Sequence, residues 1–552
     1  VGSGAGSMVA ALKAKRLGLT SVIIEKQAKV GGSTGFSGGT LWVPGNPLME
    51  REGDHDDLVE ARRYIDATAP YFGPGATAVR RDAYLQTGPV MVAFLESEGM
   101  KFERPADCPD YYTTMPGALK KTRSLTAKLF DVNVLGEWKD RLSVFPLPAM
   151  PVGVGEMSPL LLAKRTMAGR LMAMKLGFRL LRARLTGVDF RGTGAAVQGR
   201  MLKLSIDNGI DIRVETPFES FVMKDGRVAG VVARHGGRSV RIEARRGVLL
   251  NAGGFARNAE MRAEYGRPLA EQTTISNPGD TGEVLAAAIE AGAAVDCMDE
   301  AIWTGVSLGS DRALPPGVDG SGPMAVHFSH HWDISFPHSI VVDNQGRRFS
   351  NEACSYMEFG QRLQQRHKEN GGTVPAWAII ESRHRERYLW GRNPGATPQA
   401  WLDSGYMIQA GSIDELAAKT GIPPGNLNET VARFNRFAVN GVDEDFGRGD
   451  AAYDQSHGDP TVKPNPNLGA IEHPPFYAVR MYAGDTGTVG GIVTDVDGKA
   501  LRADGSVIEG LFATGNIAAA PFGKSYIAAG TSIAGSMIFA YRAVEAMARK
   551  AN

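Results

Sequence analysis

The stretch "VGSGAGSMVAALKAKRLGLTSVIIEK", Val1–Lys26, decides the fold. Its glycines fit the pattern GxGxxG/A loosely, with a serine at the third position, and a helical run and a short apolar strand follow. Such glycines let the amides at a helix N-terminus approach a pyrophosphate, and a carboxylate at the strand end accepts hydrogen bonds from ribose hydroxyls. We therefore predict a Rossmann-like α/β dinucleotide-binding unit, with these residues at the ligand: Gly2, Gly4, Gly6, Glu25 and Lys26.

Three more glycine-rich turns occur later in the chain. They are "VGGSTGFSGG" (30–39), "GVLLNAGGF" (Gly247–Phe255) and "GLFATGNIAAAPFG" (Gly510–Gly523). Clustered glycine is typical of backbone pressed against a ligand, and four such turns on one extended molecule fit FAD better than NAD. The further residues that we predict to bind FAD are Gly32, Ser33, Thr34, Ser37, Gly38, Gly39, Ala252, Gly253, Gly254, Gly515, Asn516, Ser532 and Ile533.

The overall composition argues against other classes of protein. Lys and Arg total 61 against 60 Asp and Glu, so no global field favours nucleic acid, and we predict no nucleic-acid partner. Cys108, Cys297 and Cys354 have neither disulfide-framework nor zinc-site spacing, which favours a reducing, cytoplasmic compartment. Because the chain starts inside the first glycine motif, we expect a preceding strand, and any targeting segment, to lie before Val1.

With these motifs, nearly the whole chain resembles the flavoprotein group of fumarate reductases, succinate dehydrogenase flavoprotein subunits and 3-ketosteroid dehydrogenases. The resemblance implies an FAD-binding domain formed by both chain ends, 1–276 and 488–552, with an inserted α+β catalytic domain, 277–487. No second GxGxxG motif follows a plausible strand, so we expect electrons to pass to a quinone or similar acceptor. The segment "GGSTGFSGG" lacks the histidine that carries a covalent flavin in some relatives, which predicts non-covalent FAD.

A tyrosine marks the chemistry in "GRRFSNEACSYMEFGQ", Gly346–Gln361. This segment resembles the matching segment of soluble fumarate reductases. There an arginine, the proton donor to the dicarboxylate, occupies the position that Tyr356 has in this chain. A phenol, whose pKa is ordinarily about 10, cannot pair with a substrate carboxylate, but once deprotonated it is a strong base. Tyr356 therefore argues against a dicarboxylate and for a ketone as substrate.

Two further segments, "CPDYYTT" and "GKSYIAAGTSIAG", resemble those of the 3-ketosteroid Δ1-dehydrogenases. The resemblance implies that Tyr526 and the Gly530 amide hold the steroid carbonyl at position 3 as an oxyanion-type clamp. Tyr356 would remove the proton from carbon 2 with support from the Tyr111 hydroxyl, and hydride would pass from carbon 1 to flavin N5. This chain departs from the usual Tyr-Pro-Gly-Pro-Gly by having Ile-Ala-Ala between Tyr526 and Gly530, which loosens the loop but keeps the spacing.

Several assignments stay open in the sequence. Tyr112 could face the site in place of Tyr111, and Asn351 and Glu352 are better explained as supports of the strand end than as reactants. The histidines His327, His330, His331 and His338 include one helical i, i+4 pair but no acidic third ligand, which favours a structural or substrate-lining role over a metal site. We predict no metal.

A basic, apolar segment, 158–187, lies between the glycine clusters. It contains "LLLAKRTMAGRLMAMKLGFRLLRARL", Leu160–Leu185, with seven basic and no acidic residues, and an apolar stripe from Met167 to Leu185 at helical spacing. Seven charges exclude an ordinary transmembrane helix. Either the segment lies in a membrane surface and admits a lipophilic steroid, or it is a buried helical pair whose basic side chains reach solvent.

The leading hypothesis is thus an FAD-dependent 3-ketosteroid Δ1-dehydrogenase. The alternatives are a ketosteroid dehydrogenase acting at the 4,5 bond, a soluble fumarate reductase-type enzyme, and a flavin-binding protein without catalysis.

Overall fold

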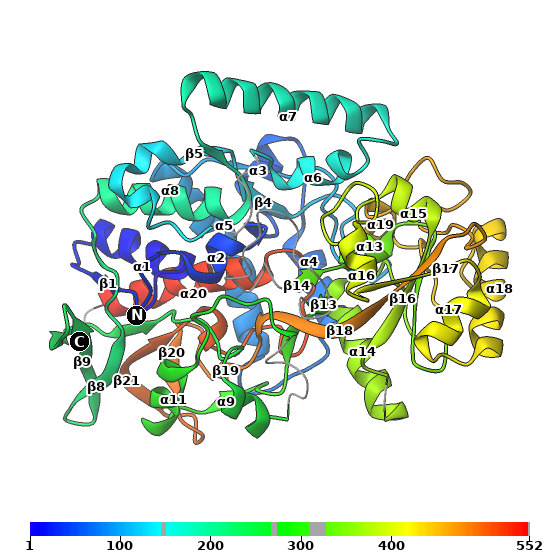
Figure 1. Cartoon of the computed structure of the whole chain (residues 1–552). Coiled ribbons are helices and arrows are strands. Elements are labelled where there is room, and N and C mark those ends of the chain that lie inside the picture. The colour runs from blue at the N-terminus through cyan, green and yellow to red at the C-terminus, as the bar shows by residue number, and fades with distance from the viewer. Residues whose placement is uncertain (145–150, 267–272, 309–326, 372, 550–552) are drawn as a thin grey trace.

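The computed structural model describes residues 1–144, 151–266, 273–308, 327–371 and 373–549. A parallel layer of short strands forms the nucleotide-binding part (Figure 1). β1 (Val22–Ile24) pairs in parallel with β7 (Asp211–Arg213), and β11 (Val248–Leu250) pairs in parallel with β21 (Val507–Ala513). The first residues join the two pairs, because the Gly2 N–H donates to the Ile24 carbonyl at 2.8 Å and the Asn251 N–H donates to the Val1 carbonyl at 2.8 Å. Segments from both halves of the chain therefore build one layer.

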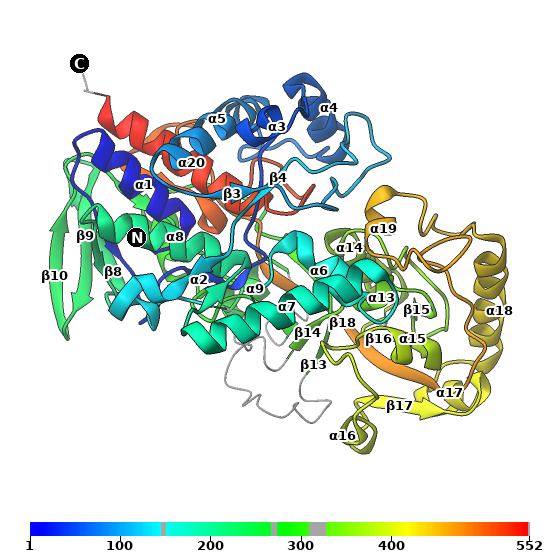
Figure 2. The same ribbon diagram turned by 90° about the horizontal axis from the view of Figure 1, so that it is seen from above.

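Three helices pack together beside this layer: α1 (Ala5–Arg16), α8 (Thr193–Asp207) and α20 (Thr531–Ala548). Their apolar residues, among them Met8, Leu12, Met201 and Ile538, belong to the largest buried cluster. Figure 2 shows α1 and α20 side by side, as their contacts require. The same region contains α2 (Gly32–Phe36), α3 (Pro47–Arg51), α4 (Leu58–Thr68), α5 (Ala78–Ser97) and η1 (Val132–Lys139).

Small antiparallel sheets surround the parallel layer. They are β2 (Thr40–Trp42), β4 (Ser124–Ala127) and β3 (Phe102–Glu103); β5 (Phe130–Asp131) and β6 (Phe190–Arg191); and β8 (Phe218–Lys224), β9 (Arg227–His235) and β10 (Arg238–Glu243). β20 (Lys499–Leu501) pairs antiparallel with β21, and η3 (Gly515–Ile517) follows β21. β12 (Val295–Asp296) pairs with β19 (Gly491–Ile492).

A six-stranded antiparallel sheet organises the remaining part (Figure 1). The long strand β18 (Phe476–Thr488) lies between β16 (Ala376–Glu381) and β17 (Met407–Ala410) in its first half, and pairs with β13 (Ala301–Leu308) in its second. β14 (His327–Ser329) and β15 (Ser339–Val342) complete the sheet. Residues of β15 and β16 are buried throughout, because helices cover the sheet. The helices here are α13 (His331–Ser335), α14 (Tyr356–Asn370), α15 (Ser382–Arg387), α16 (Gln399–Asp403), α17 (Ile413–Thr420), α18 (Pro424–Asn440) and α19 (Ala452–Ser456).

Two further helices pack against the parallel layer. α9 (Ala259–Glu264) and α11 (Glu283–Glu290) contribute Met261, Val284 and Leu285 to the same buried cluster as β11 and β21. The predicted division of the chain at residues 277 and 488 stays a prediction.

The basic segment forms two helices, α6 (Val154–Leu161) and α7 (Met167–Thr186). The Thr166 side chain caps α7 by accepting a hydrogen bond from the Gly169 N–H at 3.0 Å, and left-handed Gly187 ends it. α7 lies across the outside of the molecule (Figures 1 and 2), and its apolar stripe is exposed, with Met167 at 66% and Phe178 at 69%. The alternative of a buried helical pair is therefore wrong for α7. Among the described residues, no helix has the length and apolar character needed to cross a bilayer.

Candidate active site

One large cavity extends from the first glycine turn to a cluster of tyrosines. Its first end is lined by the strand ends and glycine turns of the parallel layer, and its second by β13, α13, α14 and the turn before α20. All but two of the predicted FAD-binding residues line it: Gly2, Gly4, Glu25, Lys26, Gly32, Ser33, Thr34, Ser37, Gly38, Gly39, Ala252, Gly253, Gly515, Asn516, Ser532 and Ile533. The chain thus brings four distant turns to one cavity.

Three helices begin at this cavity without a side-chain cap. Their N-cap residues are glycines, Gly4 for α1, Gly31 for α2 and Gly530 for α20. In α1 the Ala5 and Ser7 N–H groups donate to the Thr34 and Asn251 side chains at 3.4 and 3.1 Å. The other first-turn amides and the positive end of the helix dipole at such a terminus suit a phosphate group. Because the N-cap residues are glycines, the backbone N–H groups can come close to a ligand. Such donors fit the pyrophosphate of a dinucleotide.

Glu25 provides the matching site for a ribose. Its carboxylate is buried at the end of β1 and accepts hydrogen bonds from the Ser3 hydroxyl at 2.6 Å and the Ser3 N–H at 3.1 Å. The second oxygen accepts from the Gln27 N–H at 2.9 Å. These contacts hold the carboxylate at the cavity wall, where it can accept ribose hydroxyls.

Gly6 and Gly254, which we predicted to bind the cofactor, do not line the cavity. A Cβ atom on Gly6 would lie 2.5 Å from the Ser536 hydroxyl of α20, and one on Gly254 would lie 1.9 Å from the Thr488 hydroxyl. Both positions need glycine because the backbone is packed closely against a neighbouring element. Their contact with the cofactor stays a prediction.

Gly530 and Tyr526 lie together at the second end of the cavity. Gly530 has φ +93°, and a Cβ there would lie 2.1 Å from the Thr40 carbonyl, so no side chain fits. Within the part of the chain that the structure describes, its N–H donates to no backbone or side-chain acceptor. The Tyr526 hydroxyl is 3.2 Å from the Ser532 hydroxyl, its hydrogen-bond partner. A phenol O–H and a free amide N–H are therefore both available to one ligand oxygen.

Tyr111 and Tyr356 form a hydrogen-bonded pair of phenols, with 2.9 Å between their hydroxyl oxygens. The ring centroid of Tyr526 lies 6.1 Å from that of Tyr111 and 6.0 Å from that of Tyr356, so the three rings form one cluster. Tyr356 is the first residue of α14, whose N-cap Ser355 accepts a hydrogen bond from the Glu358 N–H at 3.2 Å. The cap sets the direction in which Tyr356 leaves the helix.

The surroundings of Tyr356 act on its ionisation in opposite directions. Burial, with the nearby Tyr526, raises the pKa of Tyr356 well above its usual value, while the hydrogen bond with Tyr111 lowers it. The α14 N-terminus also favours a negative charge at this position. Burial raises the pKa of Tyr111 as well, so Tyr111 keeps its proton and can donate it in a hydrogen bond to a Tyr356 phenolate.

The structure decides between the two adjacent tyrosines. Tyr111 lines the cavity, whereas the Tyr112 hydroxyl accepts a hydrogen bond from the Ser355 hydroxyl at 3.4 Å and does not line it. Asn351 and Glu352 make structural contacts, as expected: the Asn351 amide donates to Asp454 at 2.8 Å, and Glu352 is wholly enclosed by protein partners.

Sequence analysis missed or only partly anticipated several cavity residues, among them His331, Tyr453 and His457. With Tyr356 and Tyr111 they form a closed ring of aromatic contacts, with centroid separations between 4.5 and 5.8 Å. Burial lowers the pKa of His331 to about 3 and that of His457 to about 4, so both imidazoles are neutral. Tyr453 and His457 stand in a segment without a motif, and no local pattern could have identified them.

The other histidines have structural partners. His330 Nδ1 is 2.7 Å from Asp333, and its ring stacks on Trp390 at 4.4 Å. His338 Nδ1 is 2.8 Å from the Ala470 carbonyl oxygen. The His327 side chain lies outside the described residues. Across the described ranges, no group of three or more His, Cys, Asp or Glu side chains could hold a metal ion.

A glycine-lined nucleotide cradle joined to a tyrosine cluster defines a flavin-dependent dehydrogenase, and the family model described as "FAD binding domain" matches residues 1–533. The chain is 39% identical to 3-oxosteroid 1-dehydrogenase of Mycobacterium tuberculosis, over 98% of this chain and 96% of the relative. It belongs to the family of FAD-dependent 3-oxosteroid 1-dehydrogenases.

Two further comparisons agree with this family. The crystal structure of 3-ketosteroid Δ1-dehydrogenase from Sterolibacterium denitrificans, in complex with 1,4-androstadiene-3,17-dione, matches with a TM-score of 0.91 and 34% identity, covering 99% of this chain and 98% of that one. A 4-oxocyclohex-2-ene-1-carboxylate 5-dehydrogenase from Sinomonas cyclohexanicum is 33% identical over all of this chain and 93% of the relative. The predicted α/β flavoprotein fold and the predicted FAD cofactor are confirmed.

Proposed function

We propose that this chain catalyses the 1,2-dehydrogenation of 3-ketosteroids. The observation that carries the proposal is the Tyr111–Tyr356 pair, 2.9 Å apart, on the same cavity as Tyr526 and the free Gly530 amide. A base and a carbonyl clamp on one wall are the two groups needed to remove a proton from the carbon beside a ketone.

The substrate carbonyl is held first. The Tyr526 O–H and the Gly530 N–H donate to the oxygen at carbon 3, and they stabilise the negative charge that develops there. Gly530 is required because a Cβ there would lie 2.1 Å from the Thr40 carbonyl, so that only glycine lets this turn pack against β2 and present its N–H to the cavity. The clamp thereby acidifies the hydrogens on carbon 2.

Tyr356, as the phenolate, then removes a proton from carbon 2. The Tyr111 hydroxyl donates to the phenolate oxygen and stabilises it before the transfer. Bound FAD would supply the hydride acceptor for carbon 1, and loss of the proton from carbon 2 and the hydride from carbon 1 would leave a double bond between them. The residues that would hold FAD are the glycine turns, the three uncapped helix ends and Glu25. We expect the electrons to pass on to a quinone or similar acceptor.

Anaerobic bleaching of the bound flavin tests this function. We expect 4-androstene-3,17-dione to bleach the flavin absorbance and to yield the 1,4-diene, identified by its mass and ultraviolet spectrum. Succinate should leave the absorbance unchanged, because the site offers Tyr356 where a dicarboxylate enzyme has an arginine. A saturated 3-ketosteroid desaturated at the 4,5 bond would instead support the alternative ketosteroid reaction.

The same panel includes a monocyclic ketone, because of the similarity to the Sinomonas enzyme. We expect 4-oxocyclohexanecarboxylate to bleach the flavin much more slowly than the steroid, since the cavity is lined at its second end by apolar and aromatic groups. Bleaching by the monocyclic ketone alone, or by succinate alone, would reject the steroid reaction.

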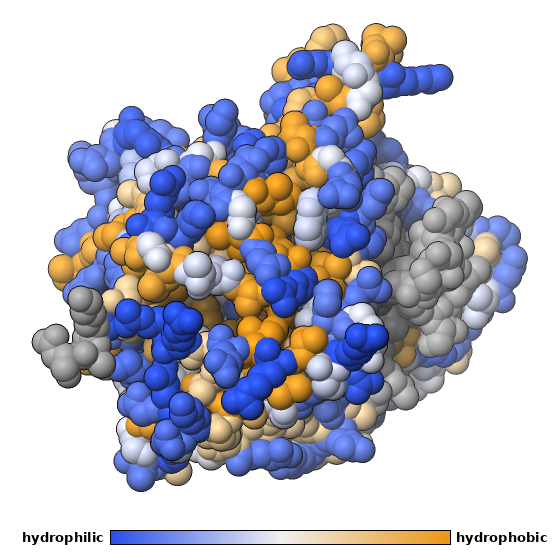
Figure 3. Space-filling view, turned by 90° about the vertical axis from the view of Figure 1, so that its left-hand side faces the viewer, coloured by the Kyte–Doolittle hydropathy of each residue, from blue (hydrophilic) through white to orange (hydrophobic). Residues whose placement is uncertain are grey.

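We also propose that α7 rests in the surface of a membrane. Figure 3 shows hydrophobic and hydrophilic residues side by side at the top of the molecule, where α7 lies. Of the basic residues in this segment, Lys175 and Arg179 pair with Glu156 and Arg165 pairs with Asp459. Arg170, Arg182 and Arg184 have no ion pair within the described residues and remain available to anionic headgroups.

The position of α6 connects this surface to the site. Val154, Met157 and Ser158 of α6 line the cavity, and α7 follows α6 after five residues. A lipophilic substrate leaving the bilayer beneath α7 would therefore meet the cavity wall directly. Cytoplasmic location with this peripheral contact stays a prediction.

Vesicle flotation checks the membrane contact. We expect the protein to float with anionic phosphatidylglycerol vesicles, and Leu171→Gln/Phe178→Gln/Leu185→Gln to lower the bound fraction at least about 10-fold, because three exposed apolar side chains are lost. Val59→Gln/Val439→Gln is the matched control, since both valines are as exposed but lie on other helices. Equal flotation of all three proteins, or of none, would reject the contact without affecting steroid turnover in buffer.

A further inference from the structure

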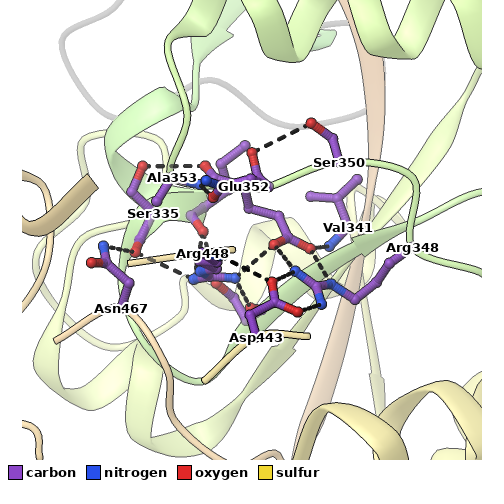
Figure 4. Close-up of polar contacts among 12 residues, drawn as sticks. Ser335, Val341, Arg348, Ser350, Glu352, Ala353, Asp443, Arg448 and Asn467 are labelled. Atoms are coloured by element: carbon purple, nitrogen blue, oxygen red, sulfur yellow. Dashed lines mark hydrogen bonds and ion pairs between the residues drawn. The ribbon is translucent and has the colours of Figure 1, made fainter. Parts of the chain in front are cut away.

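A buried ionic cluster includes residues of the loop that precedes α14, the helix that begins at Tyr356 (Figure 4). It consists of Arg348, Glu352, Asp443 and Arg448, all of which are buried. Arg348 donates to Glu352 at 2.7 and 2.9 Å and to Asp443 at 2.8 and 3.0 Å, and Arg448 donates to Glu352 at 3.0 Å. None of the four lines the cavity, so the cluster can affect the reaction only through other residues.

Arg448 joins two elements that meet at the site. Besides Glu352, its guanidinium donates to the carbonyls of Ile334, Ser335 and Phe336 at 2.9 to 3.2 Å, and to the Ser339 carbonyl at 2.8 Å. The first three carbonyls lie at the C-terminal end of α13, where a cation is favourable. One planar, multidentate group therefore fixes the end of α13 to Glu352.

The two helices linked to this cluster, α13 and α14, both begin with a residue that lines the cavity. α13 begins at His331 and α14 begins at Tyr356, four residues after Glu352, and the two rings are 5.4 Å apart. The Val341 N–H also donates to Glu352 at 3.0 Å, so the strand, the loop and the helix start share one anchor. The position of the Tyr356 hydroxyl therefore depends on where α13 and α14 begin relative to each other.

The cluster also reaches the third segment of the aromatic ring. The Arg448 and Gly449 backbone amides donate to Asp443 at 3.3 Å and Asp454 at 3.0 Å. Asp454 in turn accepts the Asn351 amide, and Tyr453 precedes it in α19. Buried ionic groups seldom stabilise a fold more than apolar residues of the same volume would, whereas they do specify geometry.

We propose that Arg448 and Glu352 are positioning residues, which hold Tyr356 in hydrogen-bonding contact with Tyr111 and against His331. The inference rests on the proposed function and adds to it the groups that set the geometry of the base. Neither residue touches the substrate or the cofactor cavity; each acts through α13, α14 and the loop between Arg348 and Tyr356.

Two conservative variants, Glu352→Gln and Arg448→Lys, test the proposal in the FAD-loaded protein. We expect kcat for 4-androstene-3,17-dione to fall about 10- to 100-fold, as for a small misplacement of a reacting group, with KM changed less than about 3-fold. The rising limb of the pH–rate profile should move to higher pH, because a displaced Tyr356 loses the Tyr111 hydrogen bond that favours its phenolate. If Glu352 and Arg448 only stabilise the fold, the variants should lower the amount of folded enzyme and leave the pH of the rising limb unchanged.

The controls separate positioning from stability. Arg366→Lys weakens another ion pair of α14, with Asp343, ten residues beyond Tyr356, and should leave the pH–rate limb unchanged. In a Tyr111→Phe background the two variants should no longer move the limb, because the contact they disturb is already absent. Glu352→Gln keeps the shape of the side chain but removes a charge beside Arg348 and Arg448, so the flavin content and circular dichroism of each variant are measured and the pH–rate limb is compared per mole of folded, FAD-loaded enzyme.

The outcomes are distinguishable from failure of the function itself. If the unaltered protein fails to oxidise the steroid, the proposed function is wrong. If it oxidises the steroid but Glu352→Gln keeps the pH–rate limb of the unaltered protein, or shifts it equally in the Tyr111→Phe background, the positioning role is wrong.

Discussion

Tyr356→Phe is expected to lower kcat for steroid dehydrogenation about 10³-fold, within the range for loss of a general base. The ring remains, so its contacts with His331 and Tyr526 are kept and only the hydroxyl is removed. FAD content and steroid affinity should stay close to those of the unaltered protein, because the ring of Tyr356 stays in place and the glycine turns and the Tyr526–Gly530 clamp are unchanged. Stopped-flow measurement of anaerobic flavin bleaching separates the chemical step from later electron transfer.

The pH dependence gives an independent check on this base. Tyr356 acts when it is deprotonated, and burial raises its pKa well above the usual value, so the rate should increase with pH through the neutral and alkaline range. Tyr112→Phe is the matched control, because this neighbouring phenol lies outside the cavity, and its turnover should change by less than about 3-fold. Comparable turnover in Tyr356→Phe would show that the proton leaves by another group.

Tyr526→Phe is expected to lower kcat/KM about 10²-fold through loss of one donor to the developing oxyanion. The ring contacts with Tyr111 and Tyr356 remain, and the Gly530 amide still donates, so part of the stabilisation survives. The loss should appear mainly in kcat, because the oxygen carries more negative charge in the transition state than in the bound ketone.

Exchange of the carbon 2 hydrogen with deuterated solvent tests the same step without hydride transfer. A 3-ketosteroid that is already desaturated at carbon 1 is unsuitable, because it can exchange only at other acidic positions. The experiment therefore uses a 1,2-saturated substrate, and the flavin is reduced beforehand so that it cannot accept hydride. Tyr526→Phe should slow this exchange in proportion to its loss of kcat. If exchange is unchanged while turnover falls, Tyr526 acts after proton removal and the clamp is wrong.

The proposed base, Tyr356, is paired with a second phenol rather than with a charged partner. Within the described residues, the ring contacts of Tyr111 and Tyr356 are made with Tyr526, Tyr453 and His331, and the imidazole of His331 is neutral because burial lowers its pKa to about 3. The buried ionic groups nearby belong to the cluster of Arg348, Glu352, Asp443 and Arg448, and none of the four lines the cavity.

Local patterns in the sequence determined the nucleotide cradle and the main catalytic candidates. The glycine turn of Val1–Lys26 and the Asn-Glu-x-x-x-Tyr and Tyr-x-x-x-Gly spacings are short, so the residues that each brings together are close in the chain and their backbone requirements appear in the residue types. The apolar stripe of α7 was likewise visible, because helical spacing depends only on sequence distance.

Tertiary structure alone decided what those residues face. It selected Tyr111 over Tyr112, assigned Gly6 and Gly254 to packing, exposed the α7 stripe, and brought Tyr453 and His457 to the site from a segment without a motif. It also placed Arg448 against both α13 and Glu352, across about a hundred residues of chain. The physical reason is that periodicity and motif spacing report only near neighbours along the backbone, whereas burial, donor direction and contact depend on which distant segment packs alongside.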